Sequence, residues 1–79
     1  MEKKINDLKP KFFIYDEHKA LMYTVQQDPR DSGCFNVFGA TGDWLTAFYS
    51  NTGSGDRFMS QFPRLSKWVD LQSDRADND

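Results

Sequence analysis

The chain has 79 residues, of which 15% are aromatic and 28% charged, and its formal net charge is −2. This length allows one domain with a thin core, and the single cysteine and single histidine exclude an internal disulfide and a Cys/His structural zinc site. No apolar run approaches the roughly 18 residues that a membrane-spanning helix needs. We therefore expect a soluble, cytoplasmic protein without a cofactor or metal, in the host cytoplasm if a phage encodes it.

The first half of the chain predicts a β-hairpin. Residues 11–15 (KFFIY) and 20–26 (ALMYTVQ) are rich in aromatic and β-branched side chains and contain no breaker. The polar turn DEHK between them is short enough to join two antiparallel strands. Pro29 and Gly33 then mark a loop.

A second hairpin is predicted at residues 34–39 (CFNVFG) and 44–50 (WLTAFYS). The turn ATGD joins these strands, and Gly42 can adopt a positive φ there. The link NTGSG then ends the sheet region.

An amphipathic helix is predicted after the second hairpin. Its apolar positions recur at the spacing i, i+4, i+7 and i+11 of one helical face, namely at Phe58, Phe62, Leu65 and Val69. Ser54 or Asp56 is the expected N-cap. Pro63 interrupts the pattern. The unbroken phase favours a helix kinked at Pro63, and the alternative is a helix that starts near Ser60 with the proline in its first turn.

Together these elements predict an α+β fold, in which a four-stranded antiparallel β-meander made of two hairpins precedes a C-terminal helix. A small β-barrel with a C-terminal helix is the alternative, because barrels also use short strands and tight turns. We expect residues 1–72 to form the single domain. Residues 73–79 are acidic and nearly free of apolar side chains, which predicts a disordered tail.

Large apolar residues lie on both alternating phases of the second hairpin, which raises the question of what covers the second face of the sheet. Successive side chains of a strand point to opposite faces. The set assigned to the helix-covered face is Leu21, Tyr23, Val25, Phe35, Val37, Leu45, Ala47 and Tyr49. The opposite face then carries Met22, Phe38, Trp44 and Phe48, with either Phe13 and Tyr15 or Phe12 and Ile14.

Two interpretations of that second face are open. Its mixture of aromatic and polar side chains is typical of a contact surface for a partner protein or a second copy of the chain. Alternatively, the N-terminal segment folds across part of it, or a barrel encloses it.

A second candidate contact patch is the helix flank that carries Arg57, Arg64 and Trp68. Arginine and tryptophan are frequent hot spots of binding, and Arg64 and Trp68 are spaced for a cation–π contact. The alternative is a solvated flank on which Trp68 is partly buried against the sheet.

No motif predicts catalysis. Cys34 and His18 lack a nucleophile elbow and an oxyanion-loop signature, and NTGSGDRF lacks the third glycine and the Lys-Ser/Thr of a phosphate loop. CFNVFGA has the aromatic spacing of an RNA-binding strand without its basic core, and a net charge of −2 argues against a surface that follows a phosphate backbone.

We therefore expect a small non-enzymatic protein-interaction module, an inhibitor or adaptor that binds a surface of a larger protein or forms a homodimer. Its size, acidity and surplus of aromatic residues fit a phage or mobile-element inhibitor of a host system. The alternative function is a nucleic-acid-binding module that uses an aromatic sheet face.

Overall fold

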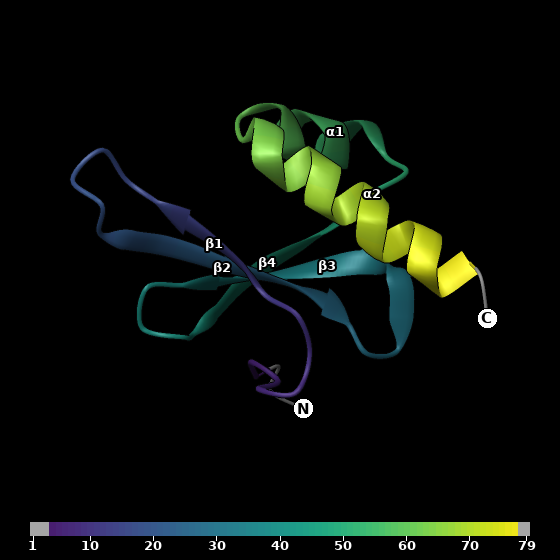
Figure 1. Ribbon diagram of the computed structural model, residues 1–79, viewed down its shortest axis with the longest axis horizontal. Coiled ribbons are helices and arrows are strands. Elements are labelled where there is room, and N and C mark those ends of the chain that lie inside the picture. The colour runs from purple at the N-terminus through teal and green to yellow at the C-terminus, as the bar shows by residue number, and fades with distance from the viewer. Residues whose placement is uncertain (1–3, 78–79) are drawn as a thin grey trace.

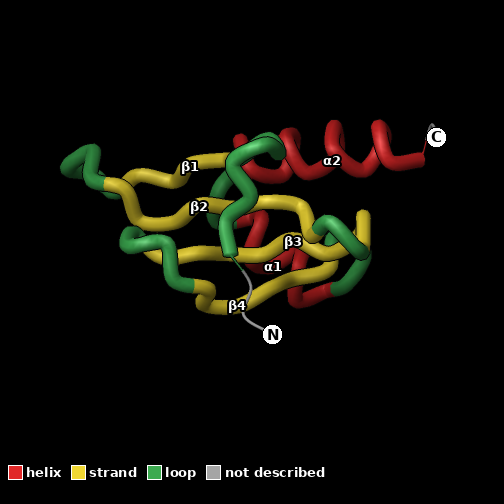
Figure 2. Tube along the Cα trace, turned by 90° about the horizontal axis from the view of Figure 1, so that it is seen from below, coloured by secondary structure: helices red, strands yellow, loops and turns green. Residues whose placement is uncertain are grey.

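One antiparallel sheet and two helices make up the part of the chain that the structure describes (Figure 1). The computed structural model describes residues 4–77, with side chains described for residues 4–72. The strands are β1 (Phe12–Tyr15), β2 (Leu21–Asp28), β3 (Asp31–Gly39) and β4 (Trp44–Tyr49), and the helices are α1 (Gly53–Ser60) and α2 (Pro63–Asp77). Figure 2 shows both helices on one side of the sheet and the N-terminal segment on the other.

The predicted meander is confirmed. The strand order is β1-β2-β3-β4, and all three neighbouring pairs are antiparallel. Gly42 adopts a φ of 90° in the turn between β3 and β4, where a side chain would be strained. Because β1 and β4 form two separate edges, the sheet is open and the barrel alternative is not formed.

The helical region differs from the prediction, because Pro63 separates two helices instead of kinking one. α1 ends at Ser60, and Pro63 is the first residue of α2. At this position the missing N–H of proline removes no helical hydrogen bond. Neither the kinked helix nor a single helix that starts near Ser60 is therefore correct, although the proline does lie in the first turn of α2.

The start of α1 packs directly against the end of β4. Its N-cap is Thr52, rather than the predicted Ser54 or Asp56, and the Thr52 side chain accepts a hydrogen bond from Gly55 N at 3.1 Å. Gly55 is buried, and a Cβ at this position would overlap the backbone carbonyl oxygen of Tyr49. Glycine therefore permits the close approach that brings α1 back over the sheet.

The acidic C-terminal segment begins inside α2. The helix runs to Asp77, so the backbone of residues 73–77 is helical. The disordered tail expected at residues 73–79 stays a prediction. Residues 78–79, and the side chains of residues 73–77, lie outside the described part of the structure. Within the described residues, neither helix combines the length and the hydropathy of a membrane-spanning segment.

The core lies between the helices and one face of the sheet. Phe35 on β3 stacks on Phe48 of β4 with ring centroids 5.6 Å apart, and Trp68 of α2 meets Phe35 edge-on at 5.9 Å. The full set of buried core residues is Ile14, Val25, Phe35, Val37, Phe48, Met59, Leu65 and Val69. The half-buried rings packed around this core belong to Phe12, Tyr23, Phe58, Phe62 and Trp68.

A β-bulge changes the phase of β4. Phe38 pairs with Trp44 and Val37 pairs with Thr46, so Leu45 is an extra residue without a direct partner on β3. The regular alternation of side chains is interrupted there. Trp44 consequently shares the face of Phe38, whereas Thr46 shares the helix-covered face with Val37.

The bulge overturns the predicted faces of β4, whereas the helix-covered positions predicted for Tyr23 and Val25 on β2 and for Phe35 and Val37 on β3 are confirmed. Leu21 is an exception, because the pairing of β1 and β2 shifts between Ile14 and Tyr15 and aligns Leu21 with Tyr15 on the second face. Phe48 points toward the helices and stacks on Phe35, although simple alternation assigns it to the second face. Leu45 and Tyr49, which the sequence assigns to the helix-covered core, are exposed, and Ala47 is half-buried on the second face. A pairing irregularity of this kind has no fixed residue signature, so the alternation of the sequence alone gives the wrong result.

Two glycine variants test how α1 meets β4. Gly55→Ala should lower the free energy of unfolding by roughly 1–3 kcal/mol, because the new methyl group overlaps backbone that cannot move aside easily. Gly53→Ala is the matched control in the same helix: nothing lies within 4 Å of its added Cβ, so stability should stay equal or rise by up to about 1 kcal/mol. Chemical denaturation of both variants measures the difference, and equal stabilities would contradict the close contact.

Candidate functional site

The N-terminal segment, residues 4–10, crosses the sheet face opposite the helices, and we call it the strap (Figure 2). Gln26 on β2 holds the strap with both ends of its amide. Asn6 N–H donates to Gln26 Oε1 at 2.8 Å, and Gln26 Nε2 donates to Asn6 O at 2.6 Å and to Lys9 O at 3.3 Å. The second face is therefore partly covered by the N-terminal segment, as one of the two sequence-based interpretations holds.

Buried polar side chains explain why this face mixes aromatic and polar residues. Thr24, Gln26 and Asn36 are all buried. Asn36 Nδ2 donates to Asp28 Oδ2 at 3.1 Å, and Trp44 Nε1 donates to Asn36 Oδ1 at 3.2 Å. Buried polar groups are costly unless they are hydrogen-bonded, so these contacts allow a polar surface to be covered.

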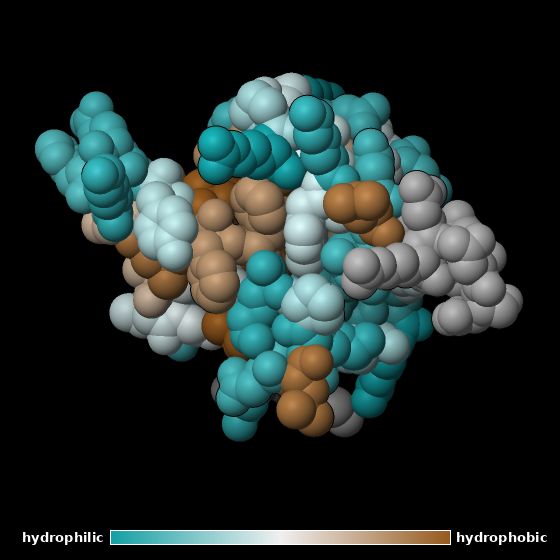
Figure 3. Space-filling view, viewed as in Figure 1, coloured by the Kyte–Doolittle hydropathy of each residue, from teal (hydrophilic) through white to brown (hydrophobic). Residues whose placement is uncertain are grey.

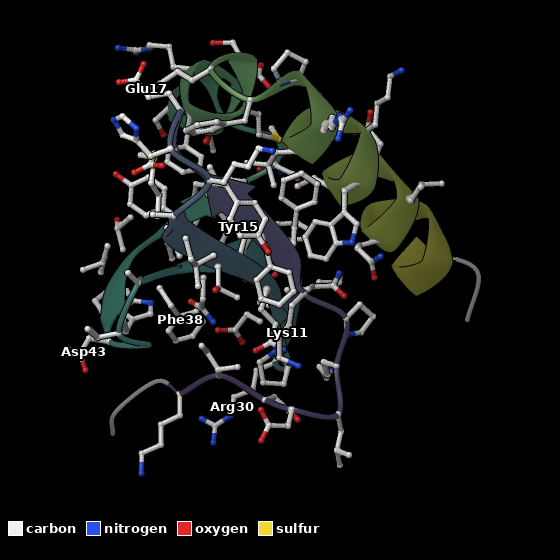
Figure 4. The ribbon with its side chains drawn as sticks, turned by 60° about the vertical axis from the view of Figure 1, so that its left-hand side comes forward. Lys11, Tyr15, Glu17, Arg30, Phe38 and Asp43 are labelled. Carbon is white, nitrogen blue, oxygen red and sulfur yellow. The ribbon has the colours of Figure 1, made fainter. Side chains whose placement is uncertain are left out.

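The predicted contact face of Met22, Phe38, Trp44 and Phe48 is not one exposed surface. Phe38 is fully buried on the strap side of the sheet (Figure 4), and Phe48 is 7% exposed on the helix side. Met22 is half-buried. Only Trp44, with 42% of its surface exposed, offers a large area to a partner.

Exposed aromatic side chains flank the strap at both edges of the sheet. On β4, Trp44 and Tyr49 lie on the strap side with Ala47 between them, and we call these residues the outer β4 row. Tyr49 is 48% exposed. On β1, Phe13 and Tyr15 also lie on the strap side, are 46% and 57% exposed, and have ring centroids 6.5 Å apart. Of the two pairs considered from the sequence, this is the pair on the second face.

Tyr49, like Leu45, is an exposed residue that the sequence prediction assigns to the core. Unbroken alternation places Tyr49 and Ala47 under the helices and leaves Phe48 outside. The one available signal is side-chain size, because regular alternation places the small Ala47 in the core and leaves the large Phe48 outside, which would fill the core poorly. A change of phase after Leu45 places Phe48 in the core instead.

The predicted helix patch is divided between two helices. Arg57 lies on α1, whereas Arg64 and Trp68 lie on α2. Trp68 is half-buried, with its ring centroid 5.7 Å from that of Phe12 and 5.9 Å from that of Phe35. Within residues 4–72 no cation–π contact joins Arg64 to Trp68, so the alternative of a tryptophan buried against the sheet is the better description.

An open groove of about 450 Å³ lies between the edge strand β1 and the start of α2. Figure 3 shows apolar surface in brown and tan there, beneath a teal rim that belongs to the helix layer. The groove is lined from the sheet by Phe12, Phe13, Ile14 and Tyr15, and from the helices by Gln61, Phe62, Pro63 and Arg64. Sequence reasoning did not predict this groove, because its two walls are distant in the chain.

His18 and Cys34 lie at opposite ends of the sheet. His18 is exposed in the turn between β1 and β2, with Nε2 3.7 Å from a Glu17 carboxylate oxygen. Cys34 is buried at the other end of β2, since its neighbour Phe35 pairs with Gln27. A strand of this length separates His18 from Cys34 by roughly 20 Å. The described residues contain no group of three or more His, Cys, Asp or Glu side chains that can hold a metal ion.

Two truncations on β4 separate core from exposed surface. Phe48→Ala should lower the free energy of unfolding by about 3–5 kcal/mol, because a ring stacked in the core is lost. Trp44→Ala should cost roughly 1–2 kcal/mol, because the ring is 42% exposed and its loss leaves Asn36 without one hydrogen bond. Denaturant unfolding measures both values, and a larger loss for Trp44→Ala would overturn the assignment of faces.

Comparison of the chain with protein-family models, curated proteins and solved structures gives no match. Three surfaces of the described residues are accessible to a partner: the outer β4 row, the aromatic pair on β1 and the groove beside β1.

Proposed function

We propose that this protein is a small protein-interaction module that binds a surface of a larger protein as an inhibitor or adaptor. The outer β4 row carries the proposal, because Trp44 and Tyr49 expose aromatic surface on a sheet edge with only the small Ala47 between them. Exposed aromatic side chains along a free sheet edge favour aggregation of an isolated domain, and a partner that covers these side chains prevents that aggregation.

The size of the exposed rings supports a contact of useful strength. Each ring of the row leaves about 100 Å² accessible, and its burial is worth up to about 2.5 kcal/mol. The hydrogen bond from Trp44 Nε1 to the buried Asn36 fixes the indole before a partner arrives, which reduces the entropy lost on binding. Tryptophan and tyrosine are also the residue types most often found as hot spots.

Two narrower forms of the proposal follow from the same surface. A second copy of the chain is one occupant of the row, and the small, acidic, aromatic-rich chain also fits a phage or mobile-element inhibitor of a host system. Both forms require the outer β4 row, so the same substitutions test them.

Trp44→Ser combined with Tyr49→Ser should remove partner binding and leave the protein folded. Wild type and the double variant are immobilised at equal density and exposed to lysate of the source or host cells, and captured proteins are quantified by mass spectrometry. The wild-type partner should fall at least tenfold, since each central aromatic anchor contributes ~2 kcal/mol.

Leu8→Ser is the matched control, because Leu8 is 95% exposed but lies on the strap outside the row. Circular dichroism confirms that each variant is folded, and size-exclusion chromatography of wild type reports self-association. Equal capture by wild type and the double variant, with no change of oligomeric state, would refute the role of the row.

Oligonucleotides test the alternative function. We expect no measurable binding of single-stranded or duplex oligonucleotides at physiological salt, because the net charge is −2 and backbone binding needs clustered cations. Fluorescence anisotropy at low and physiological salt is the measurement. Salt-sensitive binding that Arg57→Ala or Arg64→Ala weakens would instead favour a nucleic-acid-binding module that stacks bases on Phe13 and Tyr15.

A further inference from the structure

The groove between β1 and α2 combines a free strand edge, an apolar trough and an unpaired cation. We infer that an extended, acidic segment of a partner protein binds there as an additional strand, pairs with the outer edge of β1 and places alternate apolar side chains in the groove. This inference deepens the proposed function and rests on it only in taking the ligand to be a protein.

The outer edge of β1 offers backbone hydrogen-bonding groups. Asp16 N–H donates to Ala20 O at 2.9 Å, on the side of β2. Backbone groups of successive residues in an antiparallel strand point to opposite sides. Phe13 and Tyr15 are out of phase with Asp16, so their N–H and C=O groups point away from β2, where an added strand can pair with them.

The groove selects an alternating side-chain pattern. Phe12 and Ile14 line it from the helix side of β1, and Phe62 and Pro63 line it from the helices. In a strand added beside β1, every second side chain points into this trough and the others lie beside the exposed ring of Phe13. The ligand therefore needs apolar residues at every second position.

The charge at the groove favours an acidic ligand. Arg64 lines the groove, and no described acidic side chain pairs with it. Lys67 is exposed within one turn of Arg64, and Trp68 on the same flank contacts Phe12, which places this flank beside β1. Carboxylates of an added segment can pair with Arg64 and Lys67.

A second copy of the chain fits this edge less well. Arg64 lines the groove together with Tyr15, at the end of β1, whereas Lys11, before the start of β1, does not line it. In an antiparallel pairing of two β1 strands, the Tyr15 end of one copy meets the Lys11 end of the other. Arg64 then approaches a like charge at both ends of the interface.

A random peptide library tests the inference on the complete protein. The probe is a phage-displayed library of random ten-residue peptides, selected against immobilised wild type. Enriched peptides should alternate apolar residues with other residues and carry Asp or Glu. A synthetic copy of the best peptide should shift the backbone amide resonances of Phe13, Tyr15 and Arg64 in nuclear magnetic resonance spectra.

Charge reversal tests the role of the cation. Arg64→Glu should weaken the selected peptide at least tenfold, and selection against this variant should enrich basic peptides instead. Arg57→Glu on α1 changes the net charge equally and should leave the affinity within about twofold, because Arg57 does not line the groove. Equal losses in the two variants would show that only overall charge matters.

Backbone pairing has its own test. Phe13→Pro removes the outward N–H, which an edge strand tolerates, whereas Phe13→Ala removes the ring and keeps the N–H. Phe13→Pro should bind the peptide about tenfold more weakly than Phe13→Ala, since one backbone hydrogen bond is lost. If Phe13→Pro does not fold, the backbone pairing is tested on the peptide instead, by N-methylation of its odd-numbered or its even-numbered residues. N-methylation of the set whose N–H groups face β1 should abolish binding, and N-methylation of the other set should not.

Three results would overturn the inference: no enrichment over an unrelated control protein, equal tolerance of both N-methyl phases, or amide shifts confined to residues away from β1. A wild-type dimer that Phe13→Pro dissociates would assign the edge to a second copy. These failures leave the proposed function intact as long as the Trp44 and Tyr49 double variant still loses its captured partner. If the peptide experiments succeed but the Trp44 and Tyr49 double variant captures its partner as well as wild type does, the β4 contact is refuted and strand addition at β1 stays supported.

Discussion

The β-bulge at Leu45 determines how the rest of the molecule is arranged. It allows one short strand to send Trp44 to the strap side and Phe48 to the helix side, although both residues occupy the same parity in the sequence. Phe48 can then stack on Phe35, and Trp68 packs edge-on against Phe35 from above. The ring centroid of Phe48 also lies 5.1 Å from that of Phe58 on α1, so a core contact between α1 and the sheet exists because the pairing of β3 and β4 slips by one residue.

The second consequence is that the sheet has two covered faces with different chemistry. The helices cover an apolar face. The strap covers a polar face, on which Gln26 bonds the strap backbone and Asn36 bonds Asp28 and Trp44. A chain of 79 residues cannot build a thick apolar core, and hydrogen-bonded burial of this kind lets a thin peptide segment serve as the second layer.

The strap leaves both edges of the sheet exposed, and the two edges differ. β4 presents Trp44 and Tyr49 as a firm aromatic row, one ring of which is held by a hydrogen bond from below. β1 presents a backbone edge beside an apolar groove with Arg64 at its rim. The first suits a contact between folded surfaces, and the second suits an extended segment. If both proposed contacts form, the protein holds a folded partner and a peptide at once, which raises the effective concentration of one for the other.

The sequence by itself determined the existence and order of the four strands and the turn at Gly42, because those features depend on local signals: runs of β-branched and aromatic residues, breakers between them and a short link in each hairpin. It did not determine where β3 begins, since that strand starts at Asp31 and includes Gly33, which the sequence assigns to a loop. It also determined the faces of β3 and of Tyr23 and Val25 on β2, where alternation is regular. Leu21 is an exception, because the pairing of β1 and β2 shifts between Ile14 and Tyr15. Pro63 marked the right place, but the choice between a kink and a new helix depends on how α1 packs against the sheet. Tertiary structure alone decided the faces of β4, because a bulge belongs to the pairing of two strands and not to either sequence. It also decided the strap and the groove beside β1: Gln26 meets Asn6 across 20 residues of chain, and β1 meets the start of α2 from opposite ends of the protein, so no local pattern can encode either contact.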